Sequence, residues 1–503
     1  MLSTLIWFPI ASAFLIVLLG GGLDSKQLRN ISMAIAIATF GWSLFLLTKF
    51  DISLAPMQMQ ESLAWLEQIG LSYRLGLDGL SFPLVILNGL LLSIAIYIST
   101  DIQRPRLYFP LLLLLGGGVN GAFLSENLLL FFLFFEVELI PLYLLIAIWG
   151  GEKRGYAATK FLIYTAISGV LILAAFFGMA ALGSTDINGL TFNYLDLNLT
   201  NVAKPTQITL LILLVIGFGI KIPIVPLHTW LPDAHVEAST PVSTLLAGVL
   251  LKLGTYGLLR FGLGLLPEAW QAIAPFLAGW AVISVIYGCL TAITQTDMKK
   301  MVAYSSVGHM GYILLALAAA TPLSLLGATF QMVSHGLISA LLFILVGIVY
   351  KKTGTRNINS LSGLLNPERG LPITGSLMIL AAMASAGIPG MVGFIAEFVI
   401  FRSSFTVFPL QTILCMIGTG LTAVYFLLMI DKVFFGRLSI RKDGSDQITD
   451  TLQLVKWREK YPAIALALII IFFGIFPNFA TKMLESSSQA IAPNQINYSV
   501  SRL

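Results

Sequence analysis

The segment FGIKIPIVPLHTWLPDAHVEAS, residues 218–239, places a lysine, two histidines and three prolines where the flanking residues predict a membrane-spanning helix. A lysine at the centre of such a helix costs about 2.5–3.5 kcal/mol on insertion scales, so charges there are usually paired and functional. Pro223 and Pro226 interrupt the helix, and each leaves a carbonyl four residues earlier, such as that of Gly219, without its usual donor. The segment therefore predicts a broken helix that surrounds Lys221 with polar backbone groups.

Composition places the whole chain in a membrane. Hydrophobic residues make up 57% of the 503 residues and charged residues only 11%, whereas soluble proteins contain about 25% charged residues. We count about fourteen apolar runs that are each long enough to cross a hydrocarbon core of about 30 Å. Their centres lie near Phe14, Ile37, Leu90, Leu115, Ile140, Ala174, Ile216, Leu250, Val282, Leu315, Leu342, Ala382, Thr422 and Ile469. The sequence therefore predicts an all-α, polytopic membrane protein.

The hydrophilic stretches are too short for a separate soluble domain, so we expect residues 1–503 to form a single transmembrane domain. The segment AGIPGMVGFIAE, which ends at Glu397, repeats the pattern of a proline break beside a charge. Two broken helices in matching positions, the seventh and the twelfth, indicate an internal repeat. A repeat of five helices has an odd number of crossings, so the second copy is inverted. We expect three N-terminal helices in about 1–105, the first repeat in 106–265, the inverted repeat in 266–440, and a loop and last helix in 441–503.

The distribution of basic residues predicts the orientation. Most of the 29 Lys and Arg residues fall in loops that follow odd-numbered spans, among them Lys153, Lys299 and Lys351. The positive-inside rule then places both termini in a lumen or periplasm. Anionic lipid headgroups are a sufficient partner for the net charge of +5, so a nucleic acid is not implied.

Other motifs give no sign of redox or nucleotide chemistry in this chain. Cys289 and Cys415 lie in predicted helices without CxxC spacing, so they supply no thiolate set for an iron–sulfur cluster. The stretch GGGVNG, residues 116–121, fits GxGxxG but has no preceding strand, so we expect close helix packing instead. The first apolar run has neither a basic n-region nor a cleavage site, and we expect it to be the first span.

Four charged residues lie within predicted spans: Glu136, Lys221, Lys252 and Glu397. Each is a candidate for a paired functional charge, although snorkelling to an interface or a static structural pair would also account for it. Glu138 faces away from Glu136 on a straight helix, and for this residue a static structural role is as well supported as a functional one.

The four histidines are His228, His235, His309 and His335. A lone histidine in a membrane is often a satisfied hydrogen-bonding residue, yet imidazole also titrates near neutral pH and can relay protons. Zinc is disfavoured because the spacing fits no HExxH pattern and Pro232 disrupts the helix face between the first two.

Five segments together resemble the antiporter-like, proton-pumping membrane subunits of complex I. They are FEVELIPLYLLI, FGIKIPIVPLHTWLPDAHVEASTPVS, LLAGVLLKLGTYGLLRFG, KKMVAYSSVGHMGY and GIPGMVGFIAEF, and the similarity extends over nearly the whole chain. Other branches carry lysine at the twelfth-helix site or continue into a long lateral helix. Glu397, and the short polar stretch after the last predicted span, resemble the chain 4 branch of cyanobacterial and chloroplast type.

The resemblance implies a proton relay made of Glu136, Lys221, Lys252 and Glu397, with His228, His309 and His335 assisting. We expect Glu136 and Lys221 to form the ion pair that switches the relay. The resemblance also implies that this chain binds no cofactor or metal, while its complex uses iron–sulfur clusters and a quinone, plastoquinone. The implied partners are the antiporter-like chains 2 and 5, lipids and, indirectly, a peripheral arm. The implied location is a thylakoid membrane.

Two alternatives differ from this interpretation. A stand-alone or Mrp-type cation/proton antiporter subunit would share the fold and much of the motif. An intramembrane hydrolase or acyltransferase would use His228 and His235, but the sequence places no nucleophile beside either histidine.

The first prediction concerns topology. Fourteen spans place Met1 and Arg441 on opposite membrane faces, because an odd number of crossings separates them. Single cysteines introduced at the two positions should react with a membrane-impermeant maleimide from opposite sides. Labelling of both from one side would contradict the fourteen-span topology.

Overall fold

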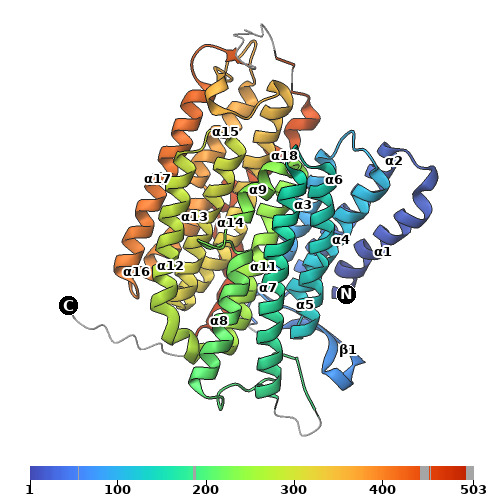
Figure 1. Ribbon diagram of the computed structural model, residues 1–503, viewed down its shortest axis with the longest axis vertical. Coiled ribbons are helices and arrows are strands. Elements are labelled where there is room, and N and C mark those ends of the chain that lie inside the picture. Colours follow the sequence, from blue (N-terminus) through green and yellow to red (C-terminus); the bar gives the residue numbers. More distant parts are fainter. Residues whose placement is uncertain (55, 185–188, 442–451, 454, 494–503) are drawn as a thin grey trace.

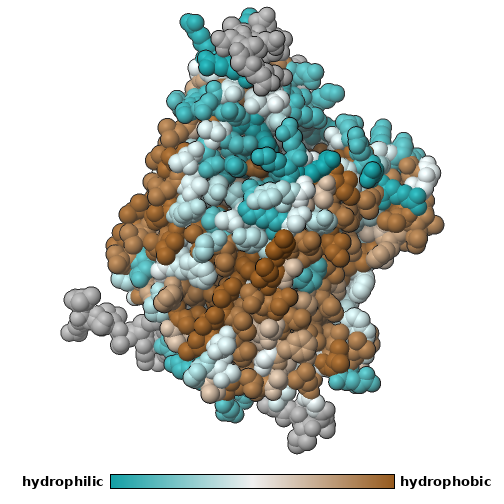
Figure 2. All heavy atoms as spheres, viewed as in Figure 1, coloured by the Kyte–Doolittle hydropathy of each residue, from teal (hydrophilic) through white to brown (hydrophobic). Residues whose placement is uncertain are grey.

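Helices that run side by side dominate the computed structural model of the chain (Figure 1). The structure describes residues 1–503 apart from 55, 185–188, 442–451, 454 and 494–503, so part of the predicted loop at 432–460 lies outside the described residues. On the face shown in Figure 2, an apolar band crosses the middle of the molecule and hydrophilic residues gather at the upper end. This distribution fits a protein whose middle contacts lipid.

Three helices open the chain, and the helices of the first half follow. Asp24 begins the second of them by accepting a hydrogen bond of 2.6 Å from the backbone N–H of Gln27, which satisfies a donor in the first turn. The elements are α1 (Leu2–Leu19), α2 (Ser25–Leu47), α3 (Phe82–Ile98), α4 (Pro105–Leu124), α5 (Leu128–Val137), α6 (Leu139–Trp149), α7 (Arg154–Gly183), α8 (Lys204–Lys221), α9 (Trp230–Glu237), α10 (Thr240–Leu245), η3 (Leu246–Leu250), α11 (Leu251–Gly257) and η4 (Leu258–Leu263).

The second half contains longer helices, and several of them begin at a proline. Proline suits this position because a backbone N–H in the first turn would have no intrahelical acceptor, so its absence costs nothing. The elements are α12 (Pro267–Ile293), α13 (Met298–Ala319), α14 (Pro322–Thr353), α15 (Pro372–Ser385), α16 (Val392–Phe405), α17 (Pro409–Phe434), α18 (Trp457–Ile475) and α19 (Asn478–Ile491). Both predicted breaks are present: α8 ends at Lys221, and residues 386–391 separate α15 from α16. The inverted repeat itself stays a prediction.

Length and apolar composition give 11 membrane-spanning helices among the described residues, or up to 12 with the bent pair α18 and α19. The count of fourteen is therefore not confirmed, although every predicted centre lies in a helical element. The difference has a physical origin: α3 is 17 residues long, and the break divides the twelfth predicted span into two pieces of 14 residues. The all-α, polytopic class is confirmed.

Two small two-stranded antiparallel sheets were not predicted, and only the first of them is a β-hairpin. β1 (Gln58–Leu66) pairs antiparallel with β2 (Leu71–Leu77), and β3 (Leu361–Ser362) pairs with β4 (Ser439–Ile440). Gly70 makes the turn of the first hairpin with a φ of 73°, and a Cβ there would lie 2.3 Å from the carbonyl oxygen of Leu190. This turn therefore requires glycine.

Close helix packing at GGGVNG is confirmed. A Cβ on Gly117 of α4 would lie 2.6 Å from Ile10 of α1, and one on Gly121 would lie 2.4 Å from the ring of Phe134. The glycines thus allow α4 to pack directly against its neighbours.

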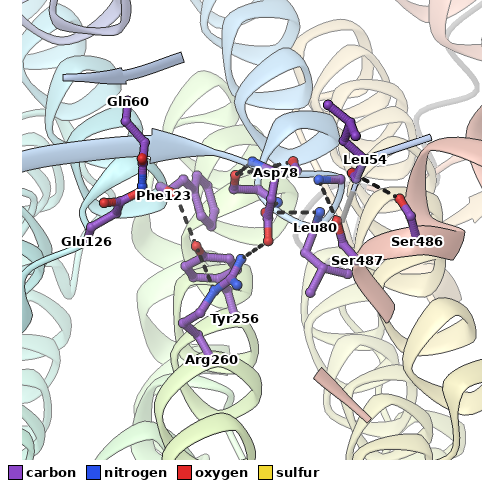
Figure 3. A network of polar contacts seen from close by, with 12 residues as sticks. Leu54, Gln60, Asp78, Leu80, Phe123, Glu126, Tyr256, Arg260, Ser486 and Ser487 are labelled. Atoms are coloured by element: carbon purple, nitrogen blue, oxygen red, sulfur yellow. Dashed lines mark hydrogen bonds and ion pairs between the residues drawn. The ribbon is translucent and has the colours of Figure 1, made fainter. Parts of the chain in front are cut away.

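A buried polar network joins the first hairpin to the helix bundle (Figure 3). Arg260 on η4 forms an ion pair with Asp78, and its Nε donates to the hydroxyl of Tyr256. Asp78 also accepts from the backbone N–H of Ser81 at 2.9 Å. Ser487 on α19 accepts from the backbone N–H of Gly79. Segments from the beginning, middle and end of the chain therefore meet at one point.

The second prediction tests this ion pair. Asp78→Asn leaves a buried guanidinium without its counter-charge, so we expect a loss of about 3–5 kcal/mol in stability. The double variant Asp78→Asn/Arg260→Gln should lose less than Asp78→Asn alone. Thermal unfolding of the detergent-solubilised protein measures both, with the exposed Asp51→Asn as a control. A wild-type Tm for Asp78→Asn would contradict the expectation.

Candidate proton-transfer site

The structure pairs the buried Lys221 with Glu138 and not with Glu136. Lys221 is the last residue of α8, and Glu138 lies between α5 and α6. The rings of Phe135 and Phe161 lie 4.8 and 5.9 Å from the Lys221 nitrogen, close enough for cation–π attraction. The predicted Glu136–Lys221 ion pair is therefore replaced by a Glu138–Lys221 pair.

The direction in which each carboxylate points accounts for this pairing. Pro141 has no N–H for the carbonyl of Val137, and α5 ends at Val137. Glu138 at this junction keeps helical backbone angles (φ −71°, ψ −24°), so the two carboxylates point to different helices, Glu138 to α8 and Glu136 to α7. Glu136 is only half-buried, and its carboxylate lies against Gly169 of α7, where a Cβ would be 2.3 Å from Oε1.

The broken segment after α8 is held by protein groups. The backbone N–H of Ile224 donates to the carbonyl of Gly219 at 2.9 Å. The expectation that Pro223 leaves this carbonyl free is therefore wrong. The indole of Trp230 donates to the carbonyl of Ile220 at 2.8 Å. The break is thus a rigid, satisfied structure at the end of the helix that carries Lys221.

Lys252 lies on α11 between two π-helical segments, η3 and η4, and is fully buried. Its Nζ donates to the carbonyl of Ala247 and lies 2.8 Å from Nδ1 of His335. Two glycines allow α14 to pack closely against η3 and α8 to pack closely against α11. A Cβ on Gly336 would lie 2.6 Å from the carbonyl of Gly248, and one on Gly254 would lie 3.1 Å from Cβ of Lys221.

His309 continues from His335 toward Glu397. The two imidazole rings have centroids 5.6 Å apart, and Nδ1 of His309 lies 3.3 Å from Oε1 of Glu397. The second nitrogen, Nε2, lies 2.9 Å from the hydroxyl of Ser385, and Thr419 donates to Oε2 of Glu397 at 3.1 Å. A cavity of about 10 Å³ opens among these side chains, about the space that one water needs.

The structure thus brings four of the seven predicted residues into one continuous group: Lys252, His335, His309 and Glu397. Lys221 adjoins this group through the contact of its Cβ with Gly254. His228 is buried but contacts the rings of Tyr287 and Tyr304, with centroids 5.1 and 6.0 Å away. Among the described residues we find no hydrogen bond or ion pair between His228 and the other six.

Two residues were not selected from the sequence. For Glu138 the sequence supported a structural and a functional role equally, although its position three residues before Pro141 could have marked it. His235 was weighed as a proton carrier with the other histidines, and as a zinc ligand or hydrolase residue with His228, but it was not placed in the relay. It is fully buried, and neither ring nitrogen has a hydrogen-bond partner. Within the described part of the chain, no group of three or more His, Cys, Asp and Glu residues is arranged to hold a metal ion.

Comparison with known proteins defines the class. Residues 125–422 match the family model described as NADH:quinone oxidoreductase/Mrp antiporter, transmembrane. The solved structure of respiratory complex I from Thermus thermophilus with bound NADH contains a chain that superposes with a TM-score of 0.86 at 26% identity, covering 98% of this chain and 99% of that one. A chain of the Mrp complex from Dietzia has the same TM-score at 20% identity, with 98% and 97% covered, which shows the fold alone.

Relatives in sequence are more specific. The NAD(P)H-quinone oxidoreductase chain 4 2 of Thermosynechococcus vestitus is 41% identical over 500 residues, covering 98% of this chain and 91% of the relative. A chain 4 1 from a Synechococcus species is also 41% identical over 500 residues, with 98% and 92% covered. The chain therefore belongs to the NADH:quinone oxidoreductase/Mrp antiporter membrane family and, within it, to the chain 4 group of NAD(P)H-quinone oxidoreductases.

The third prediction separates the two glutamates. Glu138→Gln leaves Lys221 buried without its counter-charge, so proton transport by the assembled complex should fall. The double variant Glu138→Gln/Lys221→Met should lose less transport activity than the two single variants lose together. Expressed as free energy, we expect a coupling between the two residues of about 0.5–3 kcal/mol. Glu136→Gln combined with Lys221→Met is the matched control and should show the weaker coupling. Stronger coupling for Glu136 would show that the functional pair differs from the one in this structure.

Proposed function

We propose that the chain is a proton-translocating membrane-arm subunit of an NAD(P)H- or ferredoxin-quinone oxidoreductase. The observation that carries the proposal is the continuous group from Lys252 through His335 and His309 to Glu397, with the contacts of 2.8, 5.6 and 3.3 Å described above. Lysine, histidine and glutamate can each bind and release a proton, and imidazole does so through two different nitrogens. A buried row of such groups is suited to proton transfer across the bilayer.

The Glu138–Lys221 pair supplies the switch in this proposal. Separating two buried opposite charges leaves each uncompensated, at a cost of about 3–5 kcal/mol. An ammonium that has lost its partner releases its proton more readily. Because α11 packs so closely against α8 that a Cβ on Gly254 would lie 3.1 Å from Cβ of Lys221, a change at the pair can reach the helix that carries Lys252. Glu136 is proposed as the acid through which protonation reaches this pair.

The energy involved is of the right size. Moving one proton against 100 mV requires about 2.3 kcal/mol. Opening and closing one buried ion pair changes the free energy by a similar or larger amount. One ion pair that opens and closes once in each transport cycle therefore involves enough free energy to move one proton. Quinone reduction in other subunits supplies this energy.

The family supports a specific setting for this activity. Membrane-arm subunits corresponding to chains 2 and 5 are the proposed neighbours, and lipids cover the apolar band. The cyanobacterial relatives support a thylakoid location. The distribution of Lys and Arg supports lumenal termini, and plastoquinone is the proposed electron acceptor. Iron–sulfur clusters and the quinone site belong to other subunits, and His228 stands beside the proposed route as an assisting proton carrier.

A cation/proton antiporter subunit is the second candidate, because the Dietzia Mrp chain shares the fold. Co-purification separates the two: quinone-reducing subunits should accompany this chain in the first case and Mrp-type subunits in the second.

The fourth prediction concerns Glu397. Glu397→Gln keeps the size of the side chain and removes its capacity to carry a proton. Proton uptake by membrane vesicles should fall about tenfold or more, while the amount of assembled complex is unchanged. Glu268→Gln, at an exposed position, is the control. Normal uptake by Glu397→Gln at both low and high pH would show that this acid is structural.

A further inference from the structure

A cavity of about 710 Å³ opens at the end of the molecule that carries the basic loops. Its wall is built by residues 149–153, by the end of α9 and the start of α10, and by the ends of α13 and α14 that meet them. Carboxylates and basic side chains both line it, among them Glu237, Lys299 and Lys300. A polar space of this size holds many waters. No group described so far connects it to Lys252.

Lys299 is the buried basic residue of this wall. It lies in the first turn of α13, where Asp297 accepts a hydrogen bond of 2.7 Å from its backbone N–H. Its side chain is only 5% exposed, and Nζ donates to the carbonyl of Ala238 just beyond α9. Nearby basic residues form ion pairs, Arg356 with Asp297 and Lys160 with Asp233.

Within the described residues, no carboxylate pairs with Lys299. A buried lysine of this kind can change between ammonium and amine, whereas arginine in the same place would stay charged.

His235 lies three residues before Ala238, on α9. Its ring stacks on Phe343 with a centroid distance of 4.4 Å and an interplanar angle of 14°. The side chain is fully buried, and both nitrogens lack a partner. Buried polar groups are normally satisfied, so an unpartnered imidazole points to an unseen water or a transient proton. His235 is near enough to both Lys299 and Lys252 for their charges to act on its imidazole, so it is within reach of the cavity wall and of the relay.

We propose that Lys299 takes protons from the 710 Å³ cavity and passes them through His235 to the Lys252–His335 contact. This inference rests on the proposed function and assigns its entry point. In the first step a hydrated proton in the cavity forms a bond with the free amine of Lys299. The ammonium then gives one proton, directly or through a water, to a free nitrogen of neutral His235. His235 releases the proton on its other nitrogen toward Lys252, and Lys299 is again an amine.

The experiment compares four variants in the complete complex, reconstituted in vesicles, and measures proton uptake together with quinone reduction. Lys299→Gln keeps a donor for the carbonyl of Ala238, and Lys299→Arg keeps the positive charge, but neither can cycle between charged and neutral forms. Both should lower proton uptake about tenfold or more. Lys300→Met, the neighbouring lysine on the same cavity, should leave it unchanged. Lys252→Met tests the relay itself.

The outcomes separate the two proposals. Wild-type uptake by Lys299→Arg or by Lys299→Gln would overturn the entry role, because charge or the hydrogen bond alone would then be sufficient. An equal loss in Lys300→Met would also overturn it, since the effect would belong to the charge of the cavity as a whole. If Lys252→Met pumps normally, the proposed function fails. If Lys252→Met is inactive while Lys299→Arg pumps normally, only the entry role fails.

Discussion

A charge buried in hydrocarbon has to find its partner within the protein, and the arrangement of this molecule depends on that requirement. Lys221 faces Glu138, Arg260 faces Asp78, and Lys252 faces a carbonyl and His335. Each side-chain pair joins residues that are far apart in sequence. The helices must therefore converge at fixed points, and those points determine which segments of the bundle touch.

Much of this arrangement follows from residue type and spacing. The apolar runs predict the helices, and the prolines predict where α5 and α8 end. Lys252, His309, His335 and Glu397 are recognisable because polar residues are costly at membrane depth.

The pairing itself is harder to predict. A helical wheel places Glu136 and Glu138 on opposite sides, but it does not say which side meets the helix that carries Lys221. The hydrogen bond from the N–H of Ile224 to the carbonyl of Gly219 is local but joins residues five apart, which the four-residue helix rule does not predict. The first β-hairpin was also absent from the sequence prediction. His235 differs from an ordinary buried histidine only in having no partner, and that is visible only in three dimensions.

The contact between Ser487 and Gly79 has a consequence for biogenesis. The two residues are 408 positions apart, and the hydroxyl of Ser487 accepts the backbone N–H that follows Asp78. During synthesis the segment around Asp78 enters the membrane long before α19 leaves the ribosome. Its hydrogen bonding is completed only after α19 has been translated and has folded back beneath the bundle. Until then water or a chaperone must solvate that N–H, and a ribosome stalled before α19 leaves an early helix with an unfinished end.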